Sequence, residues 1–231
     1  APVIASPQVE GNRVLVSNLA NVVVALNRDS GELIWRYAHP VDTDRASQLQ
    51  LYGAPQPFVL GEQVLAGFSD GSLAGLSLDG GALRWQRRVG EGAYPDLIAP
   101  PVLAGSQVIL AAYSEPLVAL DPETRSVGWR LGIGGAHPAT VSEDGVWVYH
   151  GGVDGVLRSL VVESGSERWS WDSETGASLT SPLITDAGLL VGSSGGSIYL
   201  VDPDDGEMIW AWDPGYRLSG FSASFATEGR Q

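Results

Sequence analysis

One phrase of the sequence recurs along the chain and ends each time in a tryptophan. The five tryptophans are Trp35, Trp85, Trp129, Trp169 and Trp210, at separations of 50, 44, 40 and 41 residues. Residues upstream keep their distances as well. A proline stands 28 positions before the tryptophan in four copies, and a glycine stands 24 positions before it in four copies. Such fixed spacing indicates a protein built from structural repeats.

Each repeat contains short apolar runs bounded by turn residues, for example 14–16 and 22–26 in the first copy. Runs of this length that are rich in β-branched residues are typical of strands. Asp70-Gly71, Asp154-Gly155 and Gly195-Gly196 supply the positive φ that tight hairpins need. Four strands in a repeat of roughly 40 residues predict an all-β fold, a β-propeller of four-stranded antiparallel blades.

The spacing divides the chain into five recognisable blades and the start of a sixth. We expect one β-propeller domain over 1–231, with blades at about 2–39, 53–90, 96–133, 134–176 and 177–215. Residues 216–231 begin a further blade without finishing it, so the chain is expected to be a fragment of a longer propeller. A propeller of this length can bury a core without splitting into domains.

A second turn precedes each tryptophan, and four of the five copies place glycine four residues before the ring. The third copy has Arg125 in that position. Because arginine tolerates a left-handed backbone poorly, we expect a changed turn in this copy. The tryptophans themselves are expected to pack between neighbouring blades, where each ring buries ~150–250 Å².

The charge balance narrows the choice of partners. The chain has 27 acidic and 13 basic residues and a net charge of −14, which argues against nucleic acid and against docking to anionic lipid headgroups. It contains no cysteine, so a disulfide, a thiol nucleophile and a thiolate metal site are all excluded. No apolar run in this chain is long enough for a transmembrane helix.

Residues able to support catalysis or metal binding are sparse. His39, His137 and His150 fall in different blades and lack metal-ligand spacing, so we expect structural or solvated roles for them. The acidic run 202–207 lacks the alternating oxygen ligands of a calcium loop and is expected to form a hairpin turn. We therefore predict no catalytic residue, no cofactor site and no metal site, and a protein that is not an enzyme.

The repeat resembles the pyrroloquinoline-quinone-like repeat, with its Leu-Asp-x-x-x-Gly and Trp pattern. Residues 200–210 and 120–125 carry this resemblance best, and it extends over essentially the whole chain. It implies a propeller fold. Quinone-dependent dehydrogenases share the repeat, but their pattern also includes a vicinal cysteine pair, which this chain lacks.

Residues 48–55 resemble the Leu-x-Leu-Arg-Gly segment of the BamB family, propeller lipoproteins of the machinery that assembles outer-membrane β-barrels. The blade that follows is also similar, and the connection 90–101 stands where the family has an Asp-x-Asp stretch. Two positions depart from the family. Tyr52 stands where the family has arginine, and Ile98 replaces the second aspartate.

The resemblance implies a non-catalytic scaffold that binds a BamA-like barrel insertase through interblade loops. The implied partner-binding residues are Leu49, Leu51, Tyr52 and Asp96, with Tyr94 and Ile98 beside them. Unfolded outer-membrane protein clients are a second implied partner, held by strand addition at a blade edge. The implied location is the periplasm, at the outer membrane, through a lipid anchor not present in this chain.

Two alternatives stay open. Leu49 and Leu51 can instead tuck under the preceding blade, in which case they form no interface. The whole chain can also be an extracytoplasmic ligand-sensing or structural propeller of a signalling protein. A kinase domain with a transmembrane segment elsewhere in the protein would indicate that function, whereas a signal peptide with a lipid-bearing cysteine would indicate the scaffold. The oligomeric state is not determined by the sequence.

Overall fold

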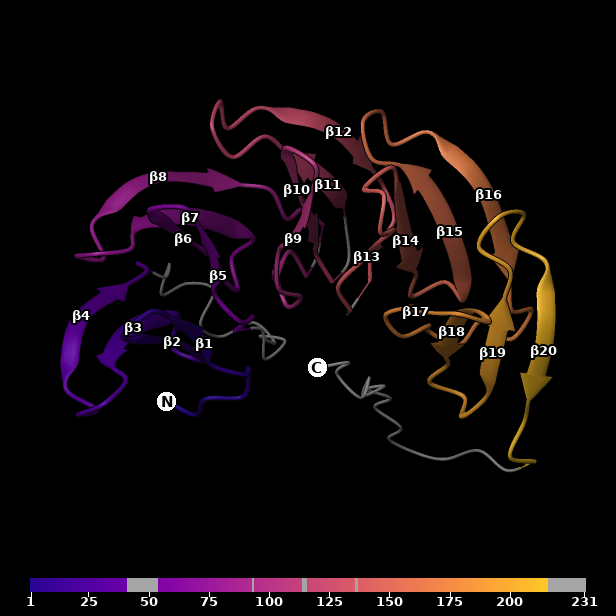
Figure 1. Cartoon of the computed structure of the whole chain (residues 1–231), viewed down its shortest axis with the longest axis horizontal. Helices are drawn as coiled ribbons and strands as arrows, with labels where there is room; N and C mark the ends of the chain where they lie inside the picture. Colours follow the sequence, from indigo (N-terminus) through magenta and orange to yellow (C-terminus); the bar gives the residue numbers. More distant parts are fainter. Residues whose placement is uncertain (41–53, 93, 114–115, 136, 216–231) are drawn as a thin grey trace.

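The computed structural model describes residues 1–231 except 41–53, 93, 114–115, 136 and 216–231. In the described part all twenty strands belong to five four-stranded antiparallel sheets, and within each sheet the strands lie in chain order. The sheets follow one another in an arc, with the first strand of each near the centre and the fourth on the outside (Figure 1). The predicted propeller of four-stranded blades is confirmed. No helix able to span a membrane occurs among the described residues.

The strands of each blade have the following bounds. Blade 1 contains β1 (Gln8–Glu10), β2 (Arg13–Asn18), β3 (Val22–Asn27) and β4 (Leu33–Ala38). Blade 2 contains β5 (Phe58–Leu60), β6 (Gln63–Gly67), β7 (Ser72–Ser77) and β8 (Leu83–Arg88). Blade 3 contains β9 (Val102–Ala104), β10 (Gln107–Ala111), β11 (Leu117–Leu120) and β12 (Val127–Leu131). Blade 4 contains β13 (Thr140–Val141), β14 (Trp147–Gly151), β15 (Val156–Val161) and β16 (Glu167–Asp172). Blade 5 contains β17 (Leu183–Thr185), β18 (Gly188–Gly192), β19 (Ile198–Val201) and β20 (Met208–Trp212).

The predicted hairpin turns between the second and third strands have the expected backbone. Gly71, Gly155 and Gly196 adopt φ of 82°, 81° and 98°, values that side chains other than glycine rarely allow. The proposed partial blade at 216–231 lies outside the described residues, and the domain limits stay a prediction.

The turn before Trp129 differs from our expectation. Arg125 adopts φ 63°, the same left-handed conformation as Gly165, which has φ 70° at the matching position of blade 4. The N–H of Arg125 donates to the carbonyl of Asp121 at 2.7 Å, just as Gly165 donates to Val161 at 2.8 Å. The predicted change of turn is wrong, because this hydrogen bond holds the arginine in a conformation that costs ~1–2 kcal/mol.

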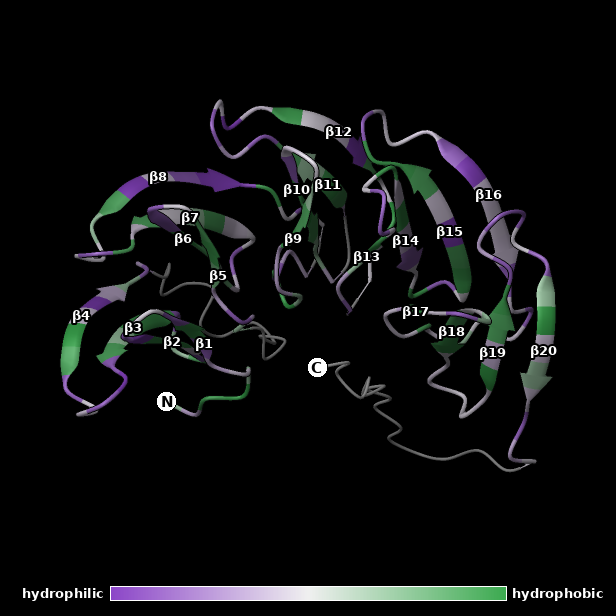
Figure 2. Ribbon diagram, in the orientation of Figure 1, coloured by the Kyte–Doolittle hydropathy of each residue, from purple (hydrophilic) through white to green (hydrophobic). Residues whose placement is uncertain are grey.

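The hydrophobic cores lie between blades rather than inside them. Each of the four core clusters in the described part joins side chains from two successive sheets. In the cluster between blades 1 and 2, for example, Leu15 and Trp35 pack with Val64, Phe68 and Leu76. Figure 2 shows hydrophobic colours on the middle strands and purple stretches on the outer strands β8 and β16. A sheet is therefore stabilised chiefly by its neighbours.

Three of the predicted tryptophan contacts between blades share one geometry. Trp35, Trp129 and Trp169 are 6–8% exposed. Their indole N–H groups donate to backbone carbonyls of the next blade, at Leu78 (2.9 Å), Val162 (2.7 Å) and Pro203 (3.0 Å). Each ring lies against the turn glycine of that next blade, where an added Cβ would stand 2.5 or 2.6 Å from the ring. The expectation that these rings pack between blades is confirmed.

The remaining two tryptophans differ. Trp85 is buried as well, but its indole N–H donates to Gln63 Oε1 of its own blade at 3.0 Å. It lies over Gly75, where an added Cβ would stand 2.2 Å from the indole nitrogen. Trp210 is 43% exposed on β20 of blade 5. Trp35, Trp129 and Trp169 thus pack on a turn glycine of the next blade, whereas Trp85 packs on a glycine of its own blade.

Candidate functional site

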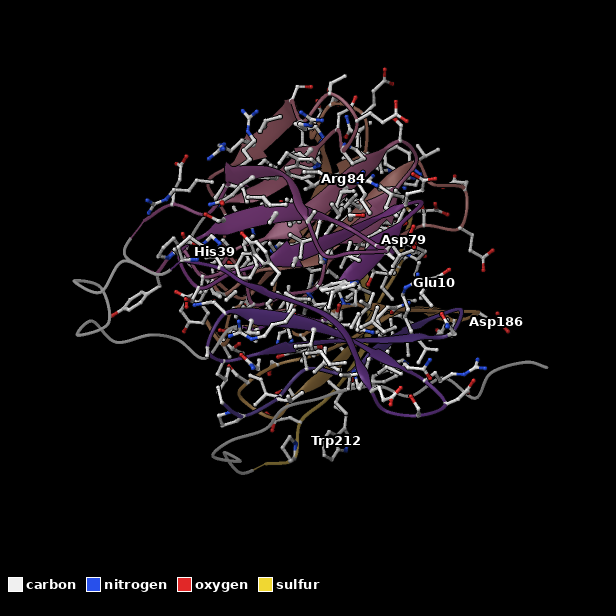
Figure 3. The ribbon with its side chains drawn as sticks, turned by 90° about the vertical axis from the view of Figure 1, so that its left-hand side faces the viewer. Glu10, His39, Asp79, Arg84, Asp186 and Trp212 are labelled. Atoms are coloured by element: carbon white, nitrogen blue, oxygen red, sulfur yellow. The ribbon has the colours of Figure 1, made fainter. Side chains whose placement is uncertain are left out.

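The antiparallel order gives the propeller two different faces. In every sheet the turns after the first and third strands lie at one edge, and the turn after the second strand lies at the other with the connection to the next blade. We call these the turn face and the connection face. Figure 3 shows Glu10, Asp79 and Asp186 on one side of the molecule and His39 on the other.

The turn face carries most of the negative charge. Its acidic residues in the described part include Glu10, Asp29, Glu62, Asp79, Asp121, Glu123, Glu143, Asp144, Glu163, Asp186, Asp202, Asp204 and Asp205. Backbone N–H groups of Thr124 and Glu123 lower the pKa of Asp121, and the Ser142 hydroxyl lowers that of Asp144. Both of these carboxylates are therefore ionised at neutral pH, and the excess of acidic residues makes the face anionic.

Of the four predicted partner-binding residues, one belongs to the described part of the chain. Leu49, Leu51 and Tyr52 lie outside the described residues. Asp96 is described and is 4% exposed, and its backbone carbonyl accepts a hydrogen bond from Tyr113 at 3.1 Å. Tyr94 is exposed and meets the ring of Tyr113 edge-on, with centroids 6.2 Å apart. The structure thus brings Tyr94 toward the surface, buries Asp96, and leaves the contact role of the set a prediction.

A pocket opens where the chain enters blades 1, 2 and 3. Its volume is about 310 Å³, and it is lined by Ile4, Ala5, Ser6, Ala54, Pro55, Gln56, Ile98 and Pro100. Gln56 Nε2 donates to Gln8 Oε1 at 3.0 Å and so ties the entry of blade 2 to blade 1. Six of the eight lining residues are apolar, although nearly half of the lining surface is polar. Sequence reasoning identified only Ile98, because the lining comes from three separate repeats.

His39 and Asp70 make the most elaborate polar contact on this face. His39 Nε2 lies 3.0 Å from Asp70 Oδ2, and its buried ring stacks on Phe68 with centroids 4.1 Å apart. Asp70 also accepts hydrogen bonds from the Ser72 N–H (2.9 Å) and Ser72 Oγ (3.0 Å). Burial raises the pKa of Asp70, but the hydrogen bonds from His39 and Ser72 outweigh it and hold the pKa below its usual value.

This cluster is not arranged for nucleophilic catalysis. In a Ser-His-Asp triad the histidine stands between the serine and the carboxylate and takes the serine proton. Here Asp70 stands between His39 and Ser72, and the serine hydroxyl donates to the carboxylate. The arrangement fixes the two segments to each other, which is a structural role.

The other two histidines are buried to different extents, His150 fully and His137 partly. His150 is fully buried on β14, and burial lowers its pKa to about 4. Burial also lowers the pKa of His137. The acidic run 202–207 forms a hairpin turn in which Asp202 Oδ1 accepts the N–H of Asp204 at 2.7 Å. Among the described residues no three His, Asp or Glu side chains are grouped to hold a metal ion.

Comparison with known sequences gives a consistent set of relatives. The profile of a family described as outer membrane protein assembly factor BamB matches residues 1–150 and 92–215. A protein of that name from Legionella pneumophila (strain Paris) is 29% identical over 175 residues, covering 71% of this chain and 44% of the relative. One from Yersinia pestis is 27% identical over 212 residues, covering 88% of this chain and 52% of the relative. The chain spans about half the length of the curated relatives it matches.

Solved structures share the architecture. The crystal structure of BamB from Moraxella catarrhalis has a TM-score of 0.78 at 22% identity and covers 92% of this chain and 64% of that one. A europium-containing methanol dehydrogenase has a TM-score of 0.81 at 12% identity and covers 94% of this chain and 52% of that one. At these identities the likeness shows the common propeller fold alone.

Proposed function

The chain belongs to the family of the outer membrane protein assembly factor BamB, and from this premise we propose that it acts as a non-catalytic scaffold in outer-membrane β-barrel assembly. In this proposal it binds a BamA-like barrel insertase through its connection face. Unfolded outer-membrane protein clients are a second proposed partner, added as strands at a blade edge. The proposed location is the periplasmic side of the outer membrane, reached through a lipid anchor on the whole protein.

The observation that carries this proposal is the pocket between the entries to blades 1, 2 and 3, which is lined mostly by apolar residues. Interfaces gain most of their affinity from a few apolar anchors in well-packed pockets. Ile4 is 58% exposed at this pocket, and Ile98 lines it within the connection 90–101. We propose that an apolar side chain of the insertase inserts there.

The charge distribution also favours the connection face as the partner-binding surface. A partner with acidic surface, or an anionic membrane, is repelled by the carboxylates of the turn face. The connection face has exposed aromatic and apolar groups, such as Tyr94 and Ile4, which interface cores favour. Binding at the connection face therefore leaves the anionic face toward solvent.

The proposed contact residues are those that the family resemblance indicates. Leu49, Leu51 and Tyr52 contact the partner directly, together with Tyr94 and the pocket. Asp96, which is buried, belongs to the same set as part of the connection 90–101. We propose that its carboxylate supports this connection beneath the contact surface.

The test is the affinity of the full-length protein for the soluble periplasmic domain of the insertase from the same bacterium, measured by titration calorimetry. Ile4→Asp places a charge in the pocket and should weaken binding at least tenfold, or about 1.4 kcal/mol. Leu33→Asp is the matched control, because Leu33 is also 58% exposed but lies on the outer strand β4. Unchanged affinity for both variants would remove the pocket from the interface, and no binding by the wild-type protein would refute the proposed function.

A further inference from the structure

The joint between blades 2 and 3 carries two arginines that the repeat does not predict. In the other blades the residue two positions after the repeat tryptophan is aromatic or leucine, namely Tyr37, Leu131, Trp171 and Trp212. Blade 2 has Arg87 at this position. The turn position four residues before the tryptophan is glycine in the other blades, but it is Arg125 in blade 3. Both arginines therefore depart from the repeat, and both belong to the same joint.

The two arginines are in contact across the joint. Nη1 of Arg87 donates a hydrogen bond to the backbone carbonyl of Arg125 at 2.5 Å. Arg87 lies on β8, which runs along the outside of the arc toward blade 3 (Figure 1), and Arg125 lies in the turn between β11 and β12. Both residues are exposed. We call Arg87 and Arg125 the arginine pair.

The arginine pair is not neutralised by nearby carboxylates. Among the residues that the structure describes, six other arginines form ion pairs with Asp or Glu, whereas Arg87 and Arg125 form none. Glu91 in the adjoining connection is paired with Arg130. Glu123, in the same turn as Arg125, pairs with neither member. The two guanidinium groups therefore keep N–H donors available for an external anion.

Both arginines occupy positions that stabilise the joint in other blades. The residues that match Arg87 in blades 1, 3 and 4 pack against the core of the following joint, whereas Arg87 is exposed and belongs to no core cluster of the described part. Arg125 has a left-handed backbone, with φ 63°, where a glycine would receive the preceding tryptophan. Side chains that break a local rule at a cost in stability are typical of functional sites. The arginine pair is therefore better explained by binding than by packing.

We propose that the arginine pair binds a carboxylate of an acidic segment in a partner protein. A guanidinium presents its N–H groups in a planar fork that matches the two oxygens of a carboxylate. The net charge of −14 and the anionic turn face repel an extended anionic surface such as a membrane. A narrow acidic segment can instead reach the outer side of the joint alone. The pair shares no residue with the pocket of the connection face, so this contact is independent of the one proposed for the insertase.

The experiment titrates the protein with a short peptide that alternates glutamate with serine. Nuclear magnetic resonance of the arginine Nε–H groups reports the contact, and the signals of Arg87 and Arg125 should shift. The same peptide with glutamine in place of glutamate should shift neither. Arg87→Gln combined with Arg125→Gly should weaken peptide binding about tenfold, as expected for the loss of two exposed ion pairs. Glycine is the residue of the matching turns, so this variant keeps the turn.

Arg36→Gln is the matched control. Arg36 is also exposed on an outer strand, β4, and it forms no ion pair with the described residues. This variant should leave the affinity for the peptide nearly unchanged. A loss as large as that of the double variant would overturn the proposal, because net charge rather than the arginine pair would then explain binding. Absence of shifts at Arg87 and Arg125 in the wild type would overturn it as well.

Two further measurements identify the ligand. Arg87→Lys keeps the charge but lacks the planar fork, so it should recover only part of the affinity that Arg87→Gln loses. Vesicles of anionic phospholipid, with zwitterionic vesicles as the reference, test a membrane as the source of the anion. If the anionic vesicles bind through the arginine pair and the peptide does not, the acidic segment is the wrong ligand.

Discussion

The repeat tryptophan packs differently at two neighbouring joints, the one between blades 3 and 4 and the one between blades 2 and 3. At the first, Trp129 lies on the turn glycine Gly165 and donates to Val162. At the second, Arg125 occupies the glycine position, and Trp85 turns back toward Gln63 and Gly75 of its own blade. The repeat is thus a pairing of a ring in one blade with a small residue in the next. When the small residue is replaced, the ring needs space elsewhere.

The largest effect should come from disrupting the joint between blades 3 and 4, where the ring packs on a turn glycine. Trp129→Ala removes a buried ring and its hydrogen bond to Val162, so it should lower the free energy of unfolding by ~3–5 kcal/mol. Urea unfolding of the purified protein measures this loss. Trp210→Ala is the control, because that ring is 43% exposed and should cost under ~1 kcal/mol. Equal losses for the two variants would contradict the view that contacts with blade 4 stabilise Trp129.

Lowering the pH should also destabilise the protein at the joint between blades 3 and 4. Buried His150 lies against Gly135 in the connection between blades 3 and 4, and its pKa is lowered from 6.5 to about 4. The unfolded chain therefore binds a proton that the folded state excludes. Stability is complete above pH 6.5 and declines as the pH falls toward 4, by about 2 kcal/mol between pH 7.5 and pH 5. This window lies above the range in which aspartates titrate.

His150→Leu should remove most of this pH dependence, and the remainder should come from His137, whose pKa is also lowered by burial. Leucine is the residue at the matching place in blade 3, where Leu110 pairs with Val118 as His150 pairs with Arg158. Urea unfolding of both proteins at pH 7.5 and pH 5 gives the comparison. A variant that loses as much stability as the wild type over this range would show that another group takes up the proton.

The smallest effect is expected at the joint between blades 2 and 3, where two substitutions should let Trp85 pack on the next blade as Trp129 does. Arg125→Gly relieves a left-handed arginine and should stabilise the protein by about 1 kcal/mol. Gly75→Ala alone should destabilise it, since the new methyl meets the Trp85 ring. With both changes Trp85 is free to lie on residue 125, as Trp35 does on Gly81 with Ala25 beneath it. A double-mutant cycle by urea unfolding should give a favourable coupling of ~1 kcal/mol, whereas strict additivity would refute the exchange.

The blades and hairpins could be predicted because their signals are local and repeated. The spacing of the tryptophans and the glycines of tight turns indicated four strands in each copy, and these strands form. The turn at Arg125 was mispredicted because residue preference was weighed without the backbone hydrogen bond to Asp121, which overrides it. The orientation of Trp85 depends jointly on Gly75, Gln63 and Arg125, and no single repeat contains that information.

The candidate site was less accessible to sequence reasoning. Its pocket combines the entries to three blades, and hydrogen bonds join Asn21 and His39 of blade 1 to Ser69 and Asp70 of blade 2. Residues so far apart become neighbours only when the blades are placed side by side. The burial of Asp96 within its connection follows from packing in the same way. Family resemblance indicated Leu49, Leu51 and Tyr52, whose contact role stays a prediction.

The location of the cores between blades has an evolutionary consequence. Blades 2, 3 and 4 each contribute half of one core to the preceding blade and half of another to the following blade, so the segment that duplicates is not the segment that is stable alone. A newly duplicated blade gains stability only if its turn fits the old neighbour's ring and its own ring fits the next turn. Selection then acts on adjoining copies in pairs, and a change such as arginine for glycine persists when its neighbour changes with it.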